Sequence, residues 1–417
     1  MSYEKKKIST EKLEVGMYIT ELDRPWEGTP YQIQGFYINS KEEITILKKL
    51  CDQVYIDGRL EQTSRRPHDR STGALHQNPG DKSLIERLPL PNIKVQYTET
   101  TTVENEHKAA VINHENLTTR IRNLFVPFKS VKELNFKDLE EPIAGMVESV
   151  IRNPNALVRL TLLKGRDSYT YNHCVNMSIL SVTFGRHLGL EREDLKTLAW
   201  GAMFCDFGKA MVPSELLNKV GRLSDEEFKI VKRHVLLSIE AIQAMESFSG
   251  EAVNIIRYHH ERFNGSGYPN GLKGKQIPIL SRLVSIVDAY DAIISDRPYA
   301  RAISPHDAIR ELYNLRNIAF QSELVEAFIQ AIGVYPIGSL VELNTGQVGV
   351  VISQNKIRHL KPKVMLILDQ NKVAYKISPV LDLLQETADK DGKEIFISNV
   401  LEPNSYGIKP EQIYQVK

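Results

Sequence analysis

The chain has 417 residues, 42% of them hydrophobic, and its 53 basic and 52 acidic residues leave a formal net charge of +1. This length allows two or three domains, and the balanced charge gives no overall electrostatic footprint for nucleic acid or an anionic membrane. Three scattered cysteines argue against a disulfide framework and suit a reducing compartment. The charged amino-terminal residues lack an apolar signal region, and no long apolar window follows, so we expect a cytoplasmic protein without a membrane span.

Residues 1–60 predict a small β-containing accessory module. Strand-like sequences occur at 17–20, 31–33 and 54–57. Residues 42–50 are typical of a short helix. Residues 61–112 are polar and rich in glycine, proline and charge, which predicts a partly disordered linker.

Residues 113–333 are predicted to be predominantly helical, because apolar residues recur there with the period of an amphipathic helix. The helical segments are expected at 116–126, 130–152, 167–187, 191–206, 224–246, 250–261, 281–295, 304–316 and 321–331. Residues 334–417 change to short strand-like runs, at 339–343, 348–352, 364–368 and 373–376, separated by turn signals. This pattern favours a small antiparallel, barrel-like β module. The predicted fold class is therefore mainly α, a helical bundle flanked by two small β modules.

Ionisable side chains lie on the predicted core faces of five different helices in this bundle. They are His173, Asp206, His234, His259, His260 and Asp288, with Cys205 as an additional candidate. A single core histidine is usually a structural residue. Five helices that each turn such a group inward are harder to explain as packing, and bundle cores that bind metals are built in this way.

The number of these side chains predicts two metal sites. They exceed what a mononuclear catalytic site needs, and Asp206 is well placed to bridge two ions. Imidazole and carboxylate ligands together favour divalent iron or manganese, with zinc as a third candidate, over calcium or magnesium. A dinuclear centre of this kind suits the hydrolysis of phosphoesters.

Several motifs of the bundle resemble the HD-GYP domain, a branch of the HD metal-dependent phosphohydrolases, over about residues 155–330. The resemblance rests on Asp206-Phe207-Gly208-Lys209, His234, His259-His260-Glu261, Gly267-Tyr268-Pro269, Asp288 and Arg297-Pro298-Tyr299. The amino-terminal module is similar to a domain of unassigned function that often accompanies HD-GYP domains. That similarity rests on Val15-Gly16-Met17-Tyr18, Trp26 and Gln34-Gly35-Phe36.

The resemblance implies an HD-type helical bundle that hydrolyses cyclic di-GMP to linear pGpG, and in some members on to GMP, through a metal-bridging hydroxide. One metal would be held by His173, Asp206 and Asp288, and the other by Asp206, His234, His259 and His260. Lys209 would act with Asp206 in catalysis, by orienting the hydroxide or assisting the leaving oxygen.

The resemblance also implies a set of substrate contacts. Tyr268 would present its ring and hydroxyl to the substrate cleft from the Gly267-Tyr268-Pro269 turn, and Arg297 would clamp a phosphate. Asp167 matches a position that contacts guanine, although it is equally well placed to cap a helix. Ala300 replaces a lysine of many relatives, and Arg301 is the candidate to compensate.

The main departure from the family pattern is Cys205, which stands where the histidine of the His-Asp pair is expected. Either its thiolate binds metal, or it is a small buried residue in a degenerate domain that acts as a nucleotide sensor or a protein-interaction scaffold. An active enzyme on hybrid cyclic GMP-AMP is a further alternative. Tyr169 occupies the place of a glutamate found in trinuclear members, which argues against a third metal. Protein partners for the terminal modules and a homodimer are compatible with the sequence.

Overall fold

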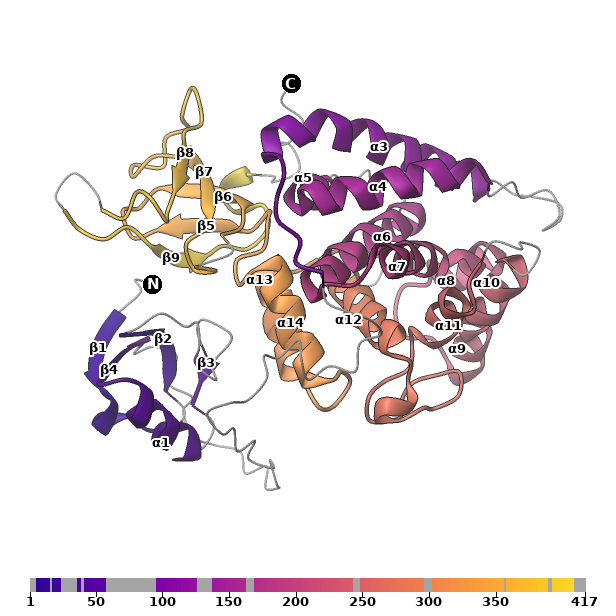
Figure 1. Ribbon diagram of the computed structural model, residues 1–417, viewed down its shortest axis with the longest axis horizontal. Helices are drawn as coiled ribbons and strands as arrows, with labels where there is room; N and C mark the ends of the chain where they lie inside the picture. Colours follow the sequence, from indigo (N-terminus) through magenta and orange to yellow (C-terminus); the bar gives the residue numbers. More distant parts are fainter. Residues whose placement is uncertain are drawn as a thin grey trace.

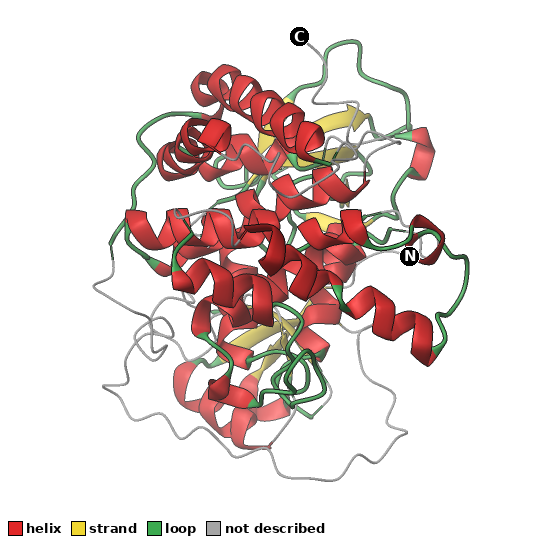
Figure 2. Cartoon of the chain, turned by 90° about the vertical axis from the view of Figure 1, so that its right-hand side faces the viewer, coloured by secondary structure: helices red, strands yellow, loops and turns green. Residues whose placement is uncertain are grey.

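The computed structural model describes residues 5–15, 17–23, 36–38, 41–57, 95–125, 137–162, 169–242, 248–295, 302–355, 358–388 and 392–408. Within these ranges helices predominate, and the strands fall into two separate sheets (Figures 1 and 2). The expected mainly α fold with a β module on either side of the bundle in sequence is confirmed.

The amino-terminal module is a four-stranded antiparallel sheet with one helix. Its elements are β1 (Lys5–Ser9), β2 (Tyr18–Leu22), β3 (Phe36–Tyr37), α1 (Lys41–Leu50) and β4 (Gln53–Asp57), with strand order β1-β4-β2-β3. Leu47 of α1 packs with Ile19 and Val54 of the central strands in a core of its own. Strand β1 was not expected from the sequence, and the strand expected at 31–33 lies outside the described residues.

The helical domain contains twelve α-helices within the described ranges. They are α3 (Val103–Leu124), α4 (Glu140–Arg152), α5 (Pro154–Leu160), α6 (Tyr169–Leu188), α7 (Arg192–Phe204), α8 (Ser214–Leu217), α9 (Asp225–Lys232), α10 (His234–Ile242), α11 (Gly250–Tyr258), α12 (Ile279–Ile293), α13 (Pro305–Asn314) and α14 (Ser322–Ile332). Helix α3 begins inside the segment expected to be a linker, where the Thr102 side chain caps it by accepting from the Asn105 backbone N–H. The single helix expected at 224–246 is two, α9 and α10, separated at Arg233.

Helix α6 is the central helix of this domain. From His173 to Phe184 every side chain is buried, and Phe184 meets Phe328 of α14 edge to face at 5.2 Å between ring centroids. A helix that is buried on all sides has to be surrounded by other helices. A polar residue at its start, such as His173, is therefore placed inside the bundle rather than at its surface.

Helices α7 and α11 approach each other closely through Gly201. A Cβ added there would lie 2.7 Å from the Cβ of Ile255. Because α7 leads into Asp206 and α11 leads into His259, this contact brings two of the candidate ligands close together.

The carboxy-terminal module is a five-stranded antiparallel sheet. Its strands are β5 (Leu340–Leu343), β6 (Val348–Ser353), β7 (Lys363–Leu368), β8 (Val380–Asp382) and β9 (Ile397–Val400), in the order β8-β7-β6-β5-β9. All six residues of β6 are buried, because small cores cover both faces of this central strand. Residues 373–376, expected as a strand, contribute only an isolated bridge between Ala374 and Leu368.

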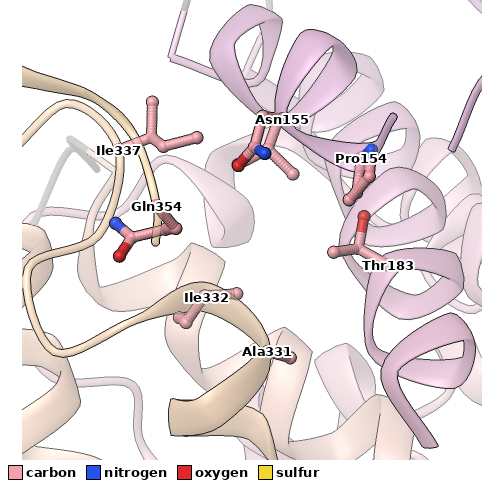
Figure 3. A pocket seen from close by; sticks show the side chains of 8 residues that line it. Pro154, Asn155, Thr183, Ala331, Ile332, Ile337 and Gln354 are labelled. Atoms are coloured by element: carbon pink, nitrogen blue, oxygen red, sulfur yellow. The ribbon is translucent and has the colours of Figure 1, made fainter. Parts of the chain in front are cut away.

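This module packs against the helical domain at the end of α6 that is remote from His173. The buried Arg159 of α5 donates through Nε to the carbonyl oxygen of Ile352, at 2.6 Å. A small hollow separates the two parts nearby, with Thr183 of α6 on one side and Gln354 on the other (Figure 3). Thr183 lies about three helical turns beyond His173.

No helix in the described part of the chain has the length and apolar character needed to cross a membrane.

We predict that Gly201→Ala lowers the free energy of unfolding by about 1–3 kcal/mol, because the added methyl group overlaps the β-branched Ile255 next to the backbone. The matched control is Gly250→Ala at the start of α11, where an added Cβ meets nothing within 4 Å. Urea unfolding of both variants checks the prediction. Equal stability of Gly201→Ala and the parent protein would contradict the close α7–α11 contact.

Candidate active site

The inward-facing ionisable residues meet in two clusters that share one carboxylate. The first consists of His173, Asp206 and Asp288, and the second of Asp206, His234, His259 and His260. Within each cluster the candidate ligand atoms all lie within 4.8 Å of one another. These are the two groups that the resemblance to the HD-GYP domain implies as the ligands of two metals.

Asp206 lies between the clusters because its two oxygens face different histidines. Its Oδ2 is 3.2 Å from His173 Nε2, while its Oδ1 is 3.3 Å from His234 Nε2 and 3.7 Å from His259 Nε2. Asp288 is the other carboxylate of the first cluster. Its Oδ1 lies 3.4 Å from His173 Nε2, and its Oδ2 lies 3.5 Å from His260 Nδ1. A carboxylate in the position of Asp206 can bind one cation through each oxygen.

Two of the histidines are held by hydrogen bonds to backbone carbonyl oxygens on the side away from the clusters. The Nδ1 of His234 lies 2.7 Å from the carbonyl oxygen of Val231, and that of His259 lies 2.8 Å from the carbonyl oxygen of Ile256. A carbonyl oxygen can only accept, so these Nδ1 atoms carry the proton. Their Nε2 atoms then present a lone pair to the cluster, as metal-binding histidines do.

Three of the atoms that face inward have no hydrogen-bond partner. They are His234 Nε2, His259 Nε2 and Asp206 Oδ1, and all three are buried. A buried polar atom without a partner costs free energy, and such atoms are few in native proteins. Divalent cations in the two clusters would satisfy all three, so the residues present fit the two metals that the family pattern implies.

The charges of the site are also those of a metal-binding site. Burial opposes ionisation of Asp206, but the Lys209 ammonium and the three nearby histidines outweigh it and hold the pKa of this carboxyl well below its usual range. His173 and His260 likewise lower the pKa of Asp288 against the effect of burial. Burial lowers the pKa of His234 and of His260. Ionised carboxylates and neutral imidazoles are the forms that bind metals.

The Asp206-Phe207-Gly208-Lys209 segment packs directly on the start of α10. A Cβ at Gly208 would lie 2.1 Å from the carbonyl oxygen of His234, so only glycine fits. The backbone N–H of Gly208 donates to the Ser238 hydroxyl at 2.7 Å, and this hydroxyl donates to the carbonyl oxygen of Cys205 at 3.1 Å. This contact places Asp206 beside His234. It also leaves Lys209 Nζ 2.5 Å from Asp206 Oδ2.

Cys205 belongs to neither cluster of the described residues. Its buried thiol donates to the carbonyl oxygen of Ala202 one turn earlier, with 3.1 Å between Sγ and oxygen. Burial, Asp206 and Asp288 together raise the pKa of this thiol well above its usual value. The structure therefore does not bring the sulfur together with the other candidate ligands, and Cys205 packs as a small buried residue at the end of α7.

Asp291 is a site residue that the sequence analysis missed. It is fully buried, and its Oδ2 lies 2.6 Å from Nδ1 of His173. Its Oδ1 accepts from the side-chain amide of Asn176 at 3.1 Å. Asp291 thus orients His173 as the two carbonyl oxygens orient His234 and His259. The sequence feature that could have indicated this role is the position of Asp291 one helical turn after Asp288 on α12.

Glu261 is a second residue whose role the sequence did not reveal. Its buried carboxylate accepts hydrogen bonds from the backbone N–H groups of Asn270 at 2.7 Å and Leu272 at 3.0 Å. The loop that carries Gly267, Tyr268 and Pro269 is thereby fixed to the end of α11. Gly267 is required there, because an added Cβ would lie 2.5 Å from the carbonyl oxygen of His260.

Tyr268 lies at the edge of the clusters as a result. Its ring is 4.7 Å from that of His260 and 6.4 Å from that of His234, measured between centroids. Burial raises the pKa of its hydroxyl, which therefore stays protonated at neutral pH. The peptide bond between Tyr268 and Pro269 is cis. The other expected substrate contacts, Asp167, Arg297 and Arg301, lie outside the described residues.

Comparison with family models assigns all three parts of the chain. A model described as an HD domain matches residues 153–322, and one described as a domain of unknown function (DUF3391) matches residues 5–139. A third, described as a KOW domain associated with HD domain, matches residues 340–409. The second match extends beyond the expected 1–60 module and includes α3.

Curated relatives support the same assignment. The cyclic di-GMP phosphodiesterase PA4108 of Pseudomonas aeruginosa is 30% identical over 91% of this chain and 89% of its own length. The cyclic di-GMP phosphodiesterase response regulator RpfG of Xanthomonas campestris is 32% identical over 48% of this chain and 54% of its own. The 3'3'-cGAMP-specific phosphodiesterase 3 of Vibrio cholerae is 23% identical over 77% of this chain and 64% of its own. With its DUF3391, HD and KOW parts in this order, the chain belongs to the HD-GYP family of HD-domain phosphohydrolases.

Proposed function

We propose that this protein is a metal-dependent phosphodiesterase that hydrolyses cyclic di-GMP to linear pGpG. The observation that carries the proposal is the position of Asp206, whose two oxygens face the Nε2 atoms of separate histidines, His173 and His234. Its relatives from Pseudomonas and Xanthomonas carry the name of this activity.

The residues that would hold the metals are those of the two clusters. His173, Asp206 and Asp288 would hold one ion, and Asp206 with His234, His259 and His260 the other. When bound, two divalent ions polarise the phosphoryl group and provide a nucleophile at neutral pH. The mixture of imidazole and carboxylate favours iron or manganese, with zinc as the next candidate.

Lys209 would stabilise the negative charge that develops on the reacting phosphate. Its ammonium lies 2.5 Å from Asp206 Oδ2 and is partly exposed, so it can reach a phosphate beside this carboxylate. Fixed positive charge at the place where negative charge develops lowers the barrier, because little reorganisation is needed during the reaction. Tyr268 would line the substrate cleft beside the clusters, where its neutral hydroxyl can donate a hydrogen bond to the substrate.

The alternative of a degenerate sensor depends on Cys205. Without the thiol, the first cluster still supplies three protein ligands, which is the usual number for a catalytic site that leaves a position open. We therefore favour an active enzyme. Hybrid cyclic GMP-AMP stays a second candidate substrate, because the Vibrio relative is named for cGAMP. The cytoplasmic location, a homodimer and protein partners for the terminal modules stay predictions from the sequence.

A product assay with metal analysis tests the proposal. The purified protein, loaded with Mn²⁺ or Fe²⁺, is expected to release linear dinucleotide from cyclic di-GMP, with cyclic GMP-AMP assayed in parallel. Asp206→Asn should lose at least about 100-fold in rate, together with bound metal, because it removes the shared carboxylate. Glu193→Gln, an exposed change on α7, serves as the control. Nucleotide binding without any product would support the sensor instead.

We predict that Cys205→Ala retains two metals per chain and the parent activity, since the thiol contacts the carbonyl oxygen of Ala202 and neither cluster. Metal stoichiometry and turnover check this. The loss of one metal equivalent would identify the sulfur as a ligand. In Cys205→His, a gain of metal and of activity would instead show that the first cluster is incomplete in the natural protein.

We predict that Asp291→Asn weakens one of the two metal equivalents by about 10–100-fold, because His173 loses the charged partner that orients its ring. Calorimetric titration of the metal-free protein should then separate into a strong step and a weakened step. Asp225→Asn, an exposed change at the start of α9, should leave both steps unchanged. Uniform weakening of both equivalents would contradict a role confined to His173.

A further inference from the structure

Three side chains form a lip beside the metal clusters. They are Phe228 and Lys232 of α9, which the chemistry above does not use, and the ring of Tyr268. The Lys232 ammonium lies 4.4 Å from the ring centroid of Phe228 and 5.1 Å from that of Tyr268. The two rings meet edge to face at 6.1 Å. A cation thus lies against two aromatic rings from separate segments of the chain.

The lip is continuous with the candidate active site. Tyr268 contacts His260 on its other side, at 4.7 Å between ring centroids, and Lys232 shortly precedes His234 in the chain. A ligand with one phosphate at the clusters would therefore extend across Tyr268 onto the lip.

The charge of Lys232 is not compensated by an acid. The two other lysines of this region are paired, Lys229 with Glu226 at 2.7 Å and Lys219 with Glu227 at 2.6 Å. Among the described residues, no carboxylate lies within ion-pairing distance of Lys232, which contacts ring faces instead. An ammonium without a carboxylate partner can bind a phosphate.

Phe228 is exposed where a surface helix normally carries polar residues. Phe228 is 41% exposed, and it lies one turn before Lys232 on the same face of α9. A phenylalanine and a lysine one turn apart can stabilise a helix as a simple pair. That explanation does not account for Tyr268, which comes from a different loop and is held in place by the backbone contacts of Glu261.

We propose that Phe228 and Lys232 form the subsite for the non-reacting half of a cyclic dinucleotide. Lys232 binds the phosphate that is not at the metals, and the ring of Phe228 stacks on one base. Both interactions match the ligand chemistry, because a cyclic dinucleotide carries a second phosphate and two flat bases. Stacking of a base on an aromatic side chain tolerates different bases. This inference rests on the proposed function.

The test separates the two halves of the substrate. Phe228→Ala and Lys232→Ala are each expected to raise KM for cyclic di-GMP by about tenfold, with a smaller effect on kcat, because they remove contacts made equally in the ground and transition states. Their rates on bis(4-nitrophenyl) phosphate, which has no second phosphate and no base, should equal the parent rate. Lys232→Arg should restore KM for cyclic di-GMP, since it keeps the charge.

Matched controls lie on the same helix. Ile230→Ala removes a side chain that is also 41% exposed, and Lys229→Ala removes a lysine that is paired with Glu226. Both should keep the parent KM. An unchanged KM in Phe228→Ala and Lys232→Ala, or equal losses on both substrates, would overturn the subsite.

Failure of the proposed function gives a different result. If the metal-loaded parent protein hydrolyses neither substrate, its affinity for cyclic di-GMP is measured by calorimetry instead. Weaker binding in both lip variants, but not in the controls, would then support the subsite in a protein that binds without turnover. Equal binding in all variants, or none in the parent, would overturn it.

Discussion

The helical domain depends on keeping the buried Asp206 carboxylate charged. Burial alone would protonate this group, since a charge far from water has a high free-energy cost. Lys209 and the three histidines offset this cost, and they come from segments far apart in the chain. Parts of α6, α7, α10 and α11 therefore have to lie near one point. The same arrangement leaves Nε2 of His234 and of His259 without a hydrogen-bond partner, which suits them to bind cations.

Close approach of these segments requires small residues at particular contacts. Gly201 lets α7 reach α11, Gly208 lets the Asp206 segment reach α10, and Gly267 lets the loop of Tyr268 fold over the backbone of His260 and Glu261. Each contact brings backbone or a β-branched side chain to within about one atomic diameter of the glycine, which a larger residue cannot share. Glycine at these places is therefore part of the geometry of the site.

The carboxy-terminal module and the site are connected through α6. This helix carries His173 near its start and Thr183 beside the hollow that borders the β module. Arg159 ties α5 to the sheet through a buried hydrogen bond to the backbone of Ile352. A buried donor of this kind would be costly to leave unpaired, so it favours one fixed packing of the sheet on the bundle.

By itself, the sequence determined the fold class and which polar residues face inward, because helical periodicity shows which side of a helix is apolar. His173, Asp206, His234, His259, His260 and Asp288 were all found by this test. Periodicity does not show what lies opposite a side chain, so only the tertiary structure decided how Asp206 divides its oxygens, that Asp291 and Glu261 support the site, and that the sulfur of Cys205 turns to Ala202. Strand β1 and the break between α9 and α10 also depend on contacts with distant parts of the chain, which no local pattern contains.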